Sequence, residues 1–212
     1  MHINKINKIF KHLNSTISNP TTELKYQNSY TFLISVVLSA QATDKSVNAA
    51  TKELFKIVKK PNDMVELGEK KLKLYIKTIG LYNSKAKNII KLSKILIDKY
   101  NNRIPKNFDS LIALPGVGNK TASVYQNEIL NIPRIAVDTH VFRVSNRLGL
   151  VKTKNPDATQ KELESIIPKK WLKSAHHLLI LHGRYTCKSQ NPICNKCVIL
   201  KLCKYKNKNE KN

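Results

Sequence analysis

Apolar residues recur every three or four positions along most of the chain, whereas no segment alternates apolar and polar residues as a half-buried strand does. In the N-terminal segment Ile3, Ile6, Phe10 and Leu13 share one helical face, with lysines between them. Residues 29–39 (SYTFLISVVLS) are apolar on nearly every side, which is typical of a buried central helix. The pattern predicts an all-α protein.

The same spacing predicts further helices, whose boundaries follow from capping residues and glycines. We expect them at 43–58, in a segment that ends at Gly80, and at about 84–100, 108–113, 119–131, 139–148, 157–167 and 169–182. Only the short glycine-containing turn 114–118 separates two of these helices. Helices joined so closely form a helix-hairpin-helix, which we place at about 108–127.

The charge of the chain indicates that the helical protein has a polyanionic partner. The chain has 38 basic and 14 acidic residues, a formal net charge of +24, spread along its whole length. Richness in Lys, Asn and Ile is also typical of an AT-rich genome, so part of this charge reflects composition. No apolar run approaches the roughly 20 residues of a membrane-spanning helix, so nucleic acid is favoured over a membrane surface.

The N-terminal segment MHINKINKIFKHLN does not have the features of a targeting sequence. It lacks a continuous apolar core and a small-residue cleavage site, and all five arginines lie at or beyond Arg103. We therefore expect a packed helix with a basic outer face, and a cytoplasmic protein.

All four cysteines lie close together near the C-terminus, with the spacing C-x6-C-x2-C-x5-C. They are Cys187, Cys194, Cys197 and Cys203. Two disulfides would suit a small secreted domain, whereas this cluster in a larger protein of a reducing compartment favours a metal. Four thiolates suit either one zinc ion or an iron-sulfur cluster, and the spacing leaves both open.

The segment LPGVGNKTA (114–122) carries the strongest candidate for chemistry. Gly116 and Gly118 are expected to turn the backbone with positive φ, and the helix that follows presents its N-terminus to an anion. The spacing is not that of a phosphate-binding loop for nucleoside triphosphates. An ordinary glycine-containing helix connection is the alternative.

Two charged residues could act on a substrate near this turn. Lys120 lies in the first turn of the second hairpin helix, where the helix dipole and neighbouring cations oppose protonation of its amine. A neutral amine is a nucleophile, whereas a charged one only holds a phosphate. Asp138, in IAVDTHVFRV, either caps the following helix or stabilises positive charge on a sugar. His140 is either a pocket residue or a packed one.

Six motifs together resemble the bacterial endonuclease III family of the helix-hairpin-helix glycosylase superfamily. They are SAQATD (39–44), IGLYNSKAKNI (79–89), LPGVGNKTA, VDTHVFRVSNRLG (137–149), LILHGRYTC (179–187) and the cysteine spacing, in the family's order. The likeness runs from about residue 20 to 205. It implies two helical lobes, a barrel at 22–132 and a second lobe of 1–21 with 133–212, with DNA bound across the cleft between them. The second lobe would carry a 4Fe-4S cluster on Cys187, Cys194, Cys197 and Cys203.

The resemblance also assigns roles to single residues. It places the family's nucleophile on Lys120, its catalytic aspartate on Asp138, the side chain that fills the hole left by a flipped base on Gln41, and an inserting loop residue on Leu81. Gly116 and Gly118 would contact the DNA backbone. Relatives often have a basic residue where this chain has Asn119, which affects phosphate contact rather than chemistry.

The expected protein is a monomeric DNA glycosylase and apurinic/apyrimidinic lyase of base excision repair. Its partner would be double-stranded DNA that contains damaged pyrimidines or abasic sites, cut by β-elimination through a lysine Schiff base. A non-catalytic helix-hairpin-helix module that binds DNA is one alternative, and Lys120 with Asp138 argues against it. A monofunctional glycosylase is the other alternative, and Lys120 argues against that.

Overall fold

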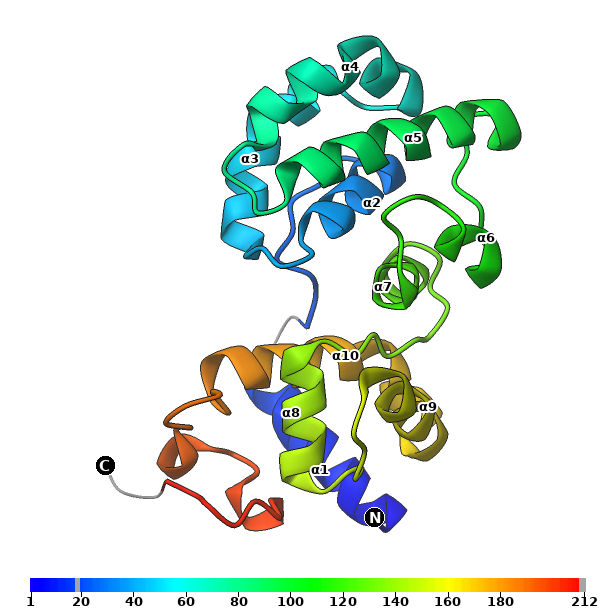
Figure 1. Cartoon of the computed structure of the whole chain (residues 1–212). Coiled ribbons are helices and arrows are strands. Elements are labelled where there is room, and N and C mark those ends of the chain that lie inside the picture. Colours follow the sequence, from blue (N-terminus) through cyan, green and yellow to red (C-terminus); the bar gives the residue numbers. More distant parts are fainter. Residues whose placement is uncertain (18–19, 210–212) are drawn as a thin grey trace. The chain divides into compact units, whose positions relative to one another are not determined.

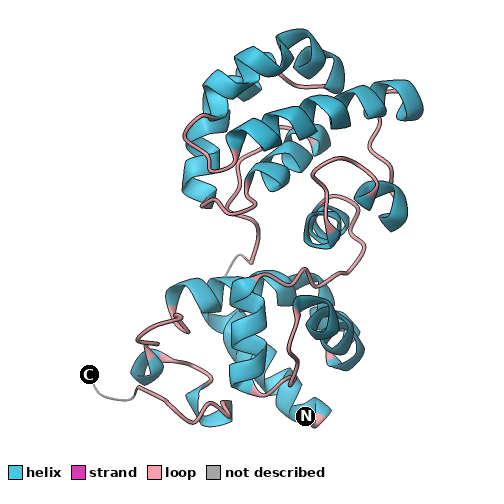
Figure 2. Cartoon of the chain, in the orientation of Figure 1, coloured by secondary structure: helices cyan, strands magenta, loops and turns pink. Residues whose placement is uncertain are grey.

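The computed structural model describes residues 1–17 and 20–209, and these residues form helices and loops without any strand (Figure 2). The predicted all-α fold is confirmed. Within the described chain no helix has both the length and the apolar character to cross a membrane. The cytoplasmic location expected from the sequence stays a prediction.

The chain divides into two compact units, both built only of helices and loops (Figure 1). The insert unit is continuous and comprises Glu23–Leu130, whereas the terminal unit combines Met1–Thr22 with Asn131–Asn212.

The insert unit is organised around one buried helix. It contains α2 (Ser29–Leu38), α3 (Asp44–Ile57), α4 (Pro61–Ile76), α5 (Tyr82–Tyr100), α6 (Phe108–Ile112) and α7 (Asn119–Glu128). Every residue of α2 from Tyr30 to Leu38 is buried, in agreement with a sequence that is apolar on nearly every side. Helices α3, α5 and α7 all pack against α2, and α4 lies along α5 (Figure 1).

The terminal unit brings the two ends of the sequence together. It contains α1 (Ile3–Thr16), α8 (Thr139–Leu148), α9 (Pro156–Ile166), α10 (Lys169–Tyr185) and the short 3-10 helices η1 (Cys194–Lys196) and η2 (Leu200–Leu202). Helices α1 and α8 both pack on α10 (Figure 1). The apolar face of α1 enters this unit's core, where the ring of Phe10 stacks on Trp171 with centroids 6.1 Å apart.

Three helix ends differ by three or more residues from those predicted. Helix α4 ends at Ile76 rather than at Gly80, α7 ends at Glu128 and α10 continues to Tyr185. Gly80 instead lies in the turn between α4 and α5, next to Leu81. Capping explains where prediction worked well: Asp138 and Gly149 bracket α8 at the predicted bounds.

Candidate functional site

The turn between α6 and α7 is a helix-hairpin-helix turn that requires glycine at one position. Gly116 has φ of 81°, a left-handed conformation that residues with a side chain rarely adopt. A Cβ atom there would lie 3.2 Å from Asn88 Cβ and 3.3 Å from Val37 Cγ1. Both backbone conformation and close packing against α2 and α5 therefore select glycine at this position.

Gly118 serves a different purpose from the one predicted. Its φ is −97°, so the expectation of a positive φ at this glycine is wrong. It is the N-cap of α7, and a Cβ atom there would meet nothing within 4 Å. The missing side chain thus leaves the start of α7 open to an approaching molecule, where backbone N–H groups and the helix dipole favour an anion.

Lys120 is exposed and stands one residue inside α7, next to this open helix start. The residues that follow it, Thr121 to Asn127, are all buried. Its backbone therefore belongs to a packed helix, while the residue itself is exposed in the N-terminal turn. This placement allows the amine to reach a phosphate or an electrophilic carbon of a bound ligand.

Gln41 and Leu81 lie on two adjoining loops of the same unit. Both are exposed and both have a left-handed backbone, with φ of 55° and 60°. A Cβ atom on Gly80 would be 3.7 Å from the carbonyl oxygen of Gln41, so the two loops are in contact. A left-handed backbone conformation at a residue other than glycine costs about 1–3 kcal/mol, and it persists only where the surrounding structure enforces it.

Asp138 is the N-cap of α8 in the terminal unit. Its Oδ1 accepts a hydrogen bond from the backbone N–H of Val141 at 2.8 Å, and its side chain is partly exposed. The capping interpretation from the sequence is therefore correct, and it leaves the second carboxylate oxygen available for another role. His140 is half-buried, with its Nδ1 3.2 Å from Arg143 Nη2.

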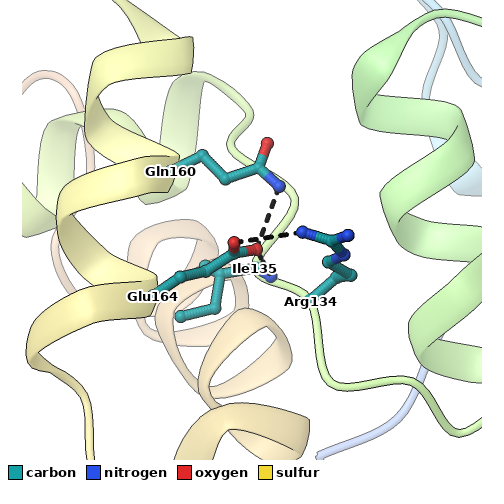
Figure 3. A network of polar contacts seen from close by, with 4 residues as sticks. All are labelled: Arg134, Ile135, Gln160 and Glu164. Atoms are coloured by element: carbon teal, nitrogen blue, oxygen red, sulfur yellow. Dashed lines mark hydrogen bonds and ion pairs between the residues drawn. The ribbon is translucent and has the colours of Figure 1, made fainter. Parts of the chain in front are cut away.

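The extended segment that leads into Asp138 is held at several points. Glu164 of α9 accepts a hydrogen bond from the backbone N–H of Ile135 at 3.0 Å and pairs with Arg134 at 3.4 Å; Gln160 donates to the same carboxylate (Figure 3). His176 Nδ1 lies 2.7 Å from the carbonyl oxygen of Ala136. These contacts fix the direction from which the chain reaches Asp138.

The four cysteines follow α10 and line one pocket. Cys194 is buried and the other three are half-buried, and all four thiols are free of disulfide bonds. The buried side chain of Leu148 also lines this pocket, and Cys187, Cys197 and Cys203 pack against the apolar core of the terminal unit. The arrangement puts four sulfur donors around one space, as expected for a shared metal group.

Arg147 of α8 ties the cysteine loop to the helix that Asp138 begins. Its guanidinium donates to Lys188 O at 2.6 Å and to Ser189 O at 2.8 Å, lies 3.7 Å from Cys187 Sγ, and stacks over the ring of Tyr205. From the sequence we expected a helix at 139–148, without any contact to the cysteine loop. Arg143 also donates to Cys187 O. Arg143 and Arg147 lie one helical turn apart and therefore on the same face of α8, and this spacing was the signal in the sequence that could have indicated the contact.

The chemistry of this pocket fits a thiolate-bound metal group. Burial raises the pKa of the Cys197 thiol to about 11 and also raises that of Cys203. A bound metal cation displaces thiol protons, so the raised pKa values are compatible with thiolate donors. The N–H of Tyr205 points at Cys203 Sγ, 3.5 Å away, and such donors stabilise thiolates. Among the described residues, no three His, Cys, Asp or Glu side chains form a ready-made site for a metal ion. The fit therefore rests on the donor set and the shared pocket.

The sequence of the chain is similar to a known protein family and to several known proteins. Residues 34–169 match the model of the HhH-GPD superfamily base excision DNA repair protein, where HhH stands for helix-hairpin-helix. The chain is 56% identical to endonuclease III of Rickettsia conorii, over 94% of this chain and 95% of that one. It is 48% identical to endonuclease III of Escherichia coli, over 95% of both chains.

Solved structures agree with the sequence comparison. A trapped endonuclease III–DNA covalent intermediate, described as an estranged-adenine complex, matches with a TM-score of 0.91 and 42% identity over 96% of each chain. A non-covalent endonuclease III–DNA complex matches equally well. A thermostable thymine-DNA glycosylase shares the fold at 23% identity and a TM-score of 0.85.

Proposed function

The chain belongs to the HhH-GPD superfamily of base excision DNA repair proteins, and we propose that within it the protein is a bifunctional DNA glycosylase and apurinic/apyrimidinic lyase that removes oxidised pyrimidines. At 44–56% identity to endonuclease III proteins over nearly its whole length, the chain is an enzyme of the endonuclease III type that acts on DNA. The resemblance seen in the sequence is thereby confirmed. The covalent mechanism, the residues that perform it and the lesion class are the proposed part.

The exposed Lys120 in the first turn of α7 carries the proposal. It combines a primary amine with an open helix N-terminus that can hold the phosphate of the same nucleotide. The solved relative described as a trapped covalent intermediate with DNA supports a covalent step for this chain too. A lysine that only contacted phosphate would give no such intermediate.

Base removal is assigned to Lys120 and Asp138. The target nucleotide must leave the base stack, since neither its C1′ nor its glycosidic bond is reachable inside a duplex. The neutral amine of Lys120 attacks C1′, the C1′–N bond breaks and the base leaves with the bonding electrons and a proton. Asp138 stabilises the positive charge that develops on the sugar. Its N-cap bond to Val141 holds the carboxylate in a fixed orientation.

Strand cleavage follows from the same covalent bond. Ring opening gives an imine between Lys120 and C1′, which acidifies the proton on C2′. A base removes that proton, a C2′–C3′ double bond forms, and the C3′–O bond breaks with departure of the 3′ phosphate. Hydrolysis of the imine then returns the free lysine. No oxidant or reductant takes part.

The remaining assignments concern DNA binding. Gly116 and Gly118 bring backbone amides of the hairpin to a phosphate, Gln41 fills the hole left by the extruded base, and Leu81 inserts beside it. The two loops that carry Gln41 and Leu81 adjoin, as insertion at one lesion requires. The proposed monomer would need no second copy to complete this set.

The four cysteines are assigned to a 4Fe-4S cluster. Cys187, Cys194, Cys197 and Cys203 would supply the thiolates, and the bound cluster would give the C-terminal loop its shape. The exposed Lys188, Lys196 and Lys201 on this loop would then contact DNA phosphates. The proposed reaction uses the cluster for structure and not for electron transfer.

An incision assay tests the proposal. The protein is incubated with duplexes that contain one defined oxidised pyrimidine, such as thymine glycol, and with matched undamaged duplexes. Base release followed by a β-elimination end on the damaged strand is expected. Base release without cutting would indicate a monofunctional glycosylase, and binding without either product would indicate a DNA-binding module.

A further inference from the structure

Lys85 of α5 is a lysine that the structure buries. Only 6% of the residue is exposed, and burial lowers the pKa of its ammonium. Lysine is rarely buried without a partner that satisfies its charge. Here the partners are two backbone carbonyl oxygens, of Leu38 at 2.9 Å and of Ala40 at 2.6 Å.

These two carbonyls have a specific place in the chain. Leu38 is the last residue of α2, where the helix dipole presents its negative end to the ammonium. The carbonyl of Ala40 belongs to the peptide group that leads directly into Gln41. The ammonium of Lys85 therefore fixes the peptide plane on which the left-handed backbone of Gln41 depends.

The backbone of Lys85 is bonded to the second loop. Its N–H donates to the carbonyl oxygen of Leu81 at 3.0 Å, in the first turn of α5, of which Leu81 is the N-cap. Leu81 is 59% exposed despite its apolar side chain. One residue thus contacts both loops, through its side chain on the Gln41 side and through its backbone on the Leu81 side.

We propose that Lys85 is a positioning residue that sets Gln41 and Leu81 at the spacing required to enter a duplex together. The inference rests on the proposed function, because it assumes that these two residues insert at the lesion. Without the ammonium, the loop of Gln41 would lose the contact that ties it to α5, and Gln41 would no longer arrive with Leu81.

The substitution Lys85→Met tests this inference, since it keeps the apolar stem and removes the ammonium. The matched control is Lys87→Met, which removes one exposed positive charge from the same helix. Two rates are measured for each protein under single-turnover conditions: base removal from a duplex with one thymine glycol, and cleavage of a single-stranded oligonucleotide with a preformed abasic site. The second substrate has no stack to open and no hole to fill.

We expect Lys85→Met to lower the duplex rate about tenfold or more relative to Lys87→Met, because small misplacements of positioning groups have effects of this size. Cleavage of the single strand should stay within about twofold of the control, because the nucleophile on α7 is untouched. The fluorescence of 2-aminopurine placed opposite the lesion should rise on binding of the control and not of Lys85→Met.

A double-mutant cycle with Gln41→Ala separates positioning from general destabilisation. If Lys85 acts through the loop of Gln41, adding Lys85→Met to Gln41→Ala should lower the duplex rate no further than the larger single effect. A double variant whose rate is lowered by the product of the two single effects would contradict the proposal. If Lys85→Met does not fold, Lys85→Gln, which has no charge and a shorter side chain than lysine, is tested for the same pattern.

The outcomes distinguish a failure of this inference from a failure of the proposed function. A wild-type protein that acts on neither substrate would refute the proposed function. A wild-type protein that acts on both, with Lys85→Met lowered equally on both or not at all, would refute the role of Lys85 alone. Failure of both Lys85 variants to fold would show that the residue is structural, and would also refute its positioning role.

Discussion

Asp138 Oδ1 accepts the backbone N–H of Val141 at 2.8 Å, so the carboxylate proposed to stabilise the reacting sugar is also the N-cap of α8. A change at this position therefore alters both chemistry and helix stability, and only a pair of variants separates the two. Asparagine is about as good an N-cap as aspartate, whereas alanine costs about 1 kcal/mol as a cap.

Asp138→Asn should keep the melting temperature close to that of the wild type and strongly slow base removal from a damaged duplex. Cleavage at a preformed abasic site should be affected far less, because that site already offers an aldehyde and no base has to leave. Asp138→Ala should show the same kinetic pattern with an added loss of stability. If Asp138→Asn instead released the base at the normal rate, Asp138 would be a helix cap only.

The two hairpin glycines should respond in opposite ways to the same substitution. Gly116→Ala places a Cβ atom against Asn88 and Val37 on a left-handed backbone, and we expect a loss of more than about 1 kcal/mol in the free energy of unfolding. Gly118→Ala meets open space with an ordinary φ, so stability should be nearly unchanged. Chemical denaturation of both variants measures this.

DNA binding provides the second half of that comparison. Because the space at Gly118 is where a phosphate would approach the start of α7, Gly118→Ala should weaken DNA binding in spite of normal stability. Equal binding by the folded Gly118→Ala variant and the wild type would remove this glycine from the DNA interface.

Purified protein should be yellow-brown, with the absorbance of a thiolate-bound iron cluster. Cys197→Ser should lose this absorbance together with the fold of the C-terminal loop, because Cys187, Cys197 and Cys203 pack against the apolar core of the terminal unit. Ser189→Ala, in the same loop but not a ligand, is the control, since its carbonyl contact with Arg147 is kept. Stoichiometric zinc without iron in anaerobically prepared protein would contradict the cluster assignment.

Binding of damaged duplex should weaken steeply with salt. With about four to six phosphates neutralised, log K should fall with log salt at a slope of roughly −4 to −5. Lys120→Gln should change that slope by at most about one unit. A flat response would mean that the net charge of +24 reflects composition and not a binding surface.

The apolar periodicity, the capping residues and the glycines of the sequence were sufficient to predict most helices and the hairpin, because these signals are local. These signals failed where tertiary contacts determine the burial of a side chain or the conformation of the backbone. In the sequence Lys85 resembles the surface lysines of α5, because its carbonyl partners lie at the end of α2 and in the loop that follows α2. The left-handed backbone conformations of Gln41 and Leu81 could not be predicted, because neither residue is a glycine.

The same distinction applies to the candidate site. The roles of Lys120 and Asp138 could be suggested from residue type and helix position, whereas Gly118 was misjudged because a glycine signals either a positive φ or an open surface. Which of these applies depends on neighbours that lie far away in the sequence.

The nucleophile itself is tested by trapping. If Lys120 forms an imine with C1′, borohydride added during turnover should reduce it to a stable secondary amine and leave the protein attached to the damaged strand. Peptide mass mapping should place the adduct on Lys120. Lys120→Gln should trap nothing while still binding the damaged duplex, and Lys106→Gln, which removes another exposed positive charge of the same unit, should trap normally.

A phosphate contact at Lys120 would behave differently, because losing it would weaken binding modestly and leave residual cutting at high enzyme concentration. Loss of the nucleophile removes the chemistry at any concentration. Normal incision by Lys120→Gln, or an adduct on another lysine or on the N-terminal amine, would therefore assign Lys120 to phosphate binding and move the reaction elsewhere. Saturating Lys120→Gln with damaged duplex before adding borohydride excludes weak binding as the cause of a negative result.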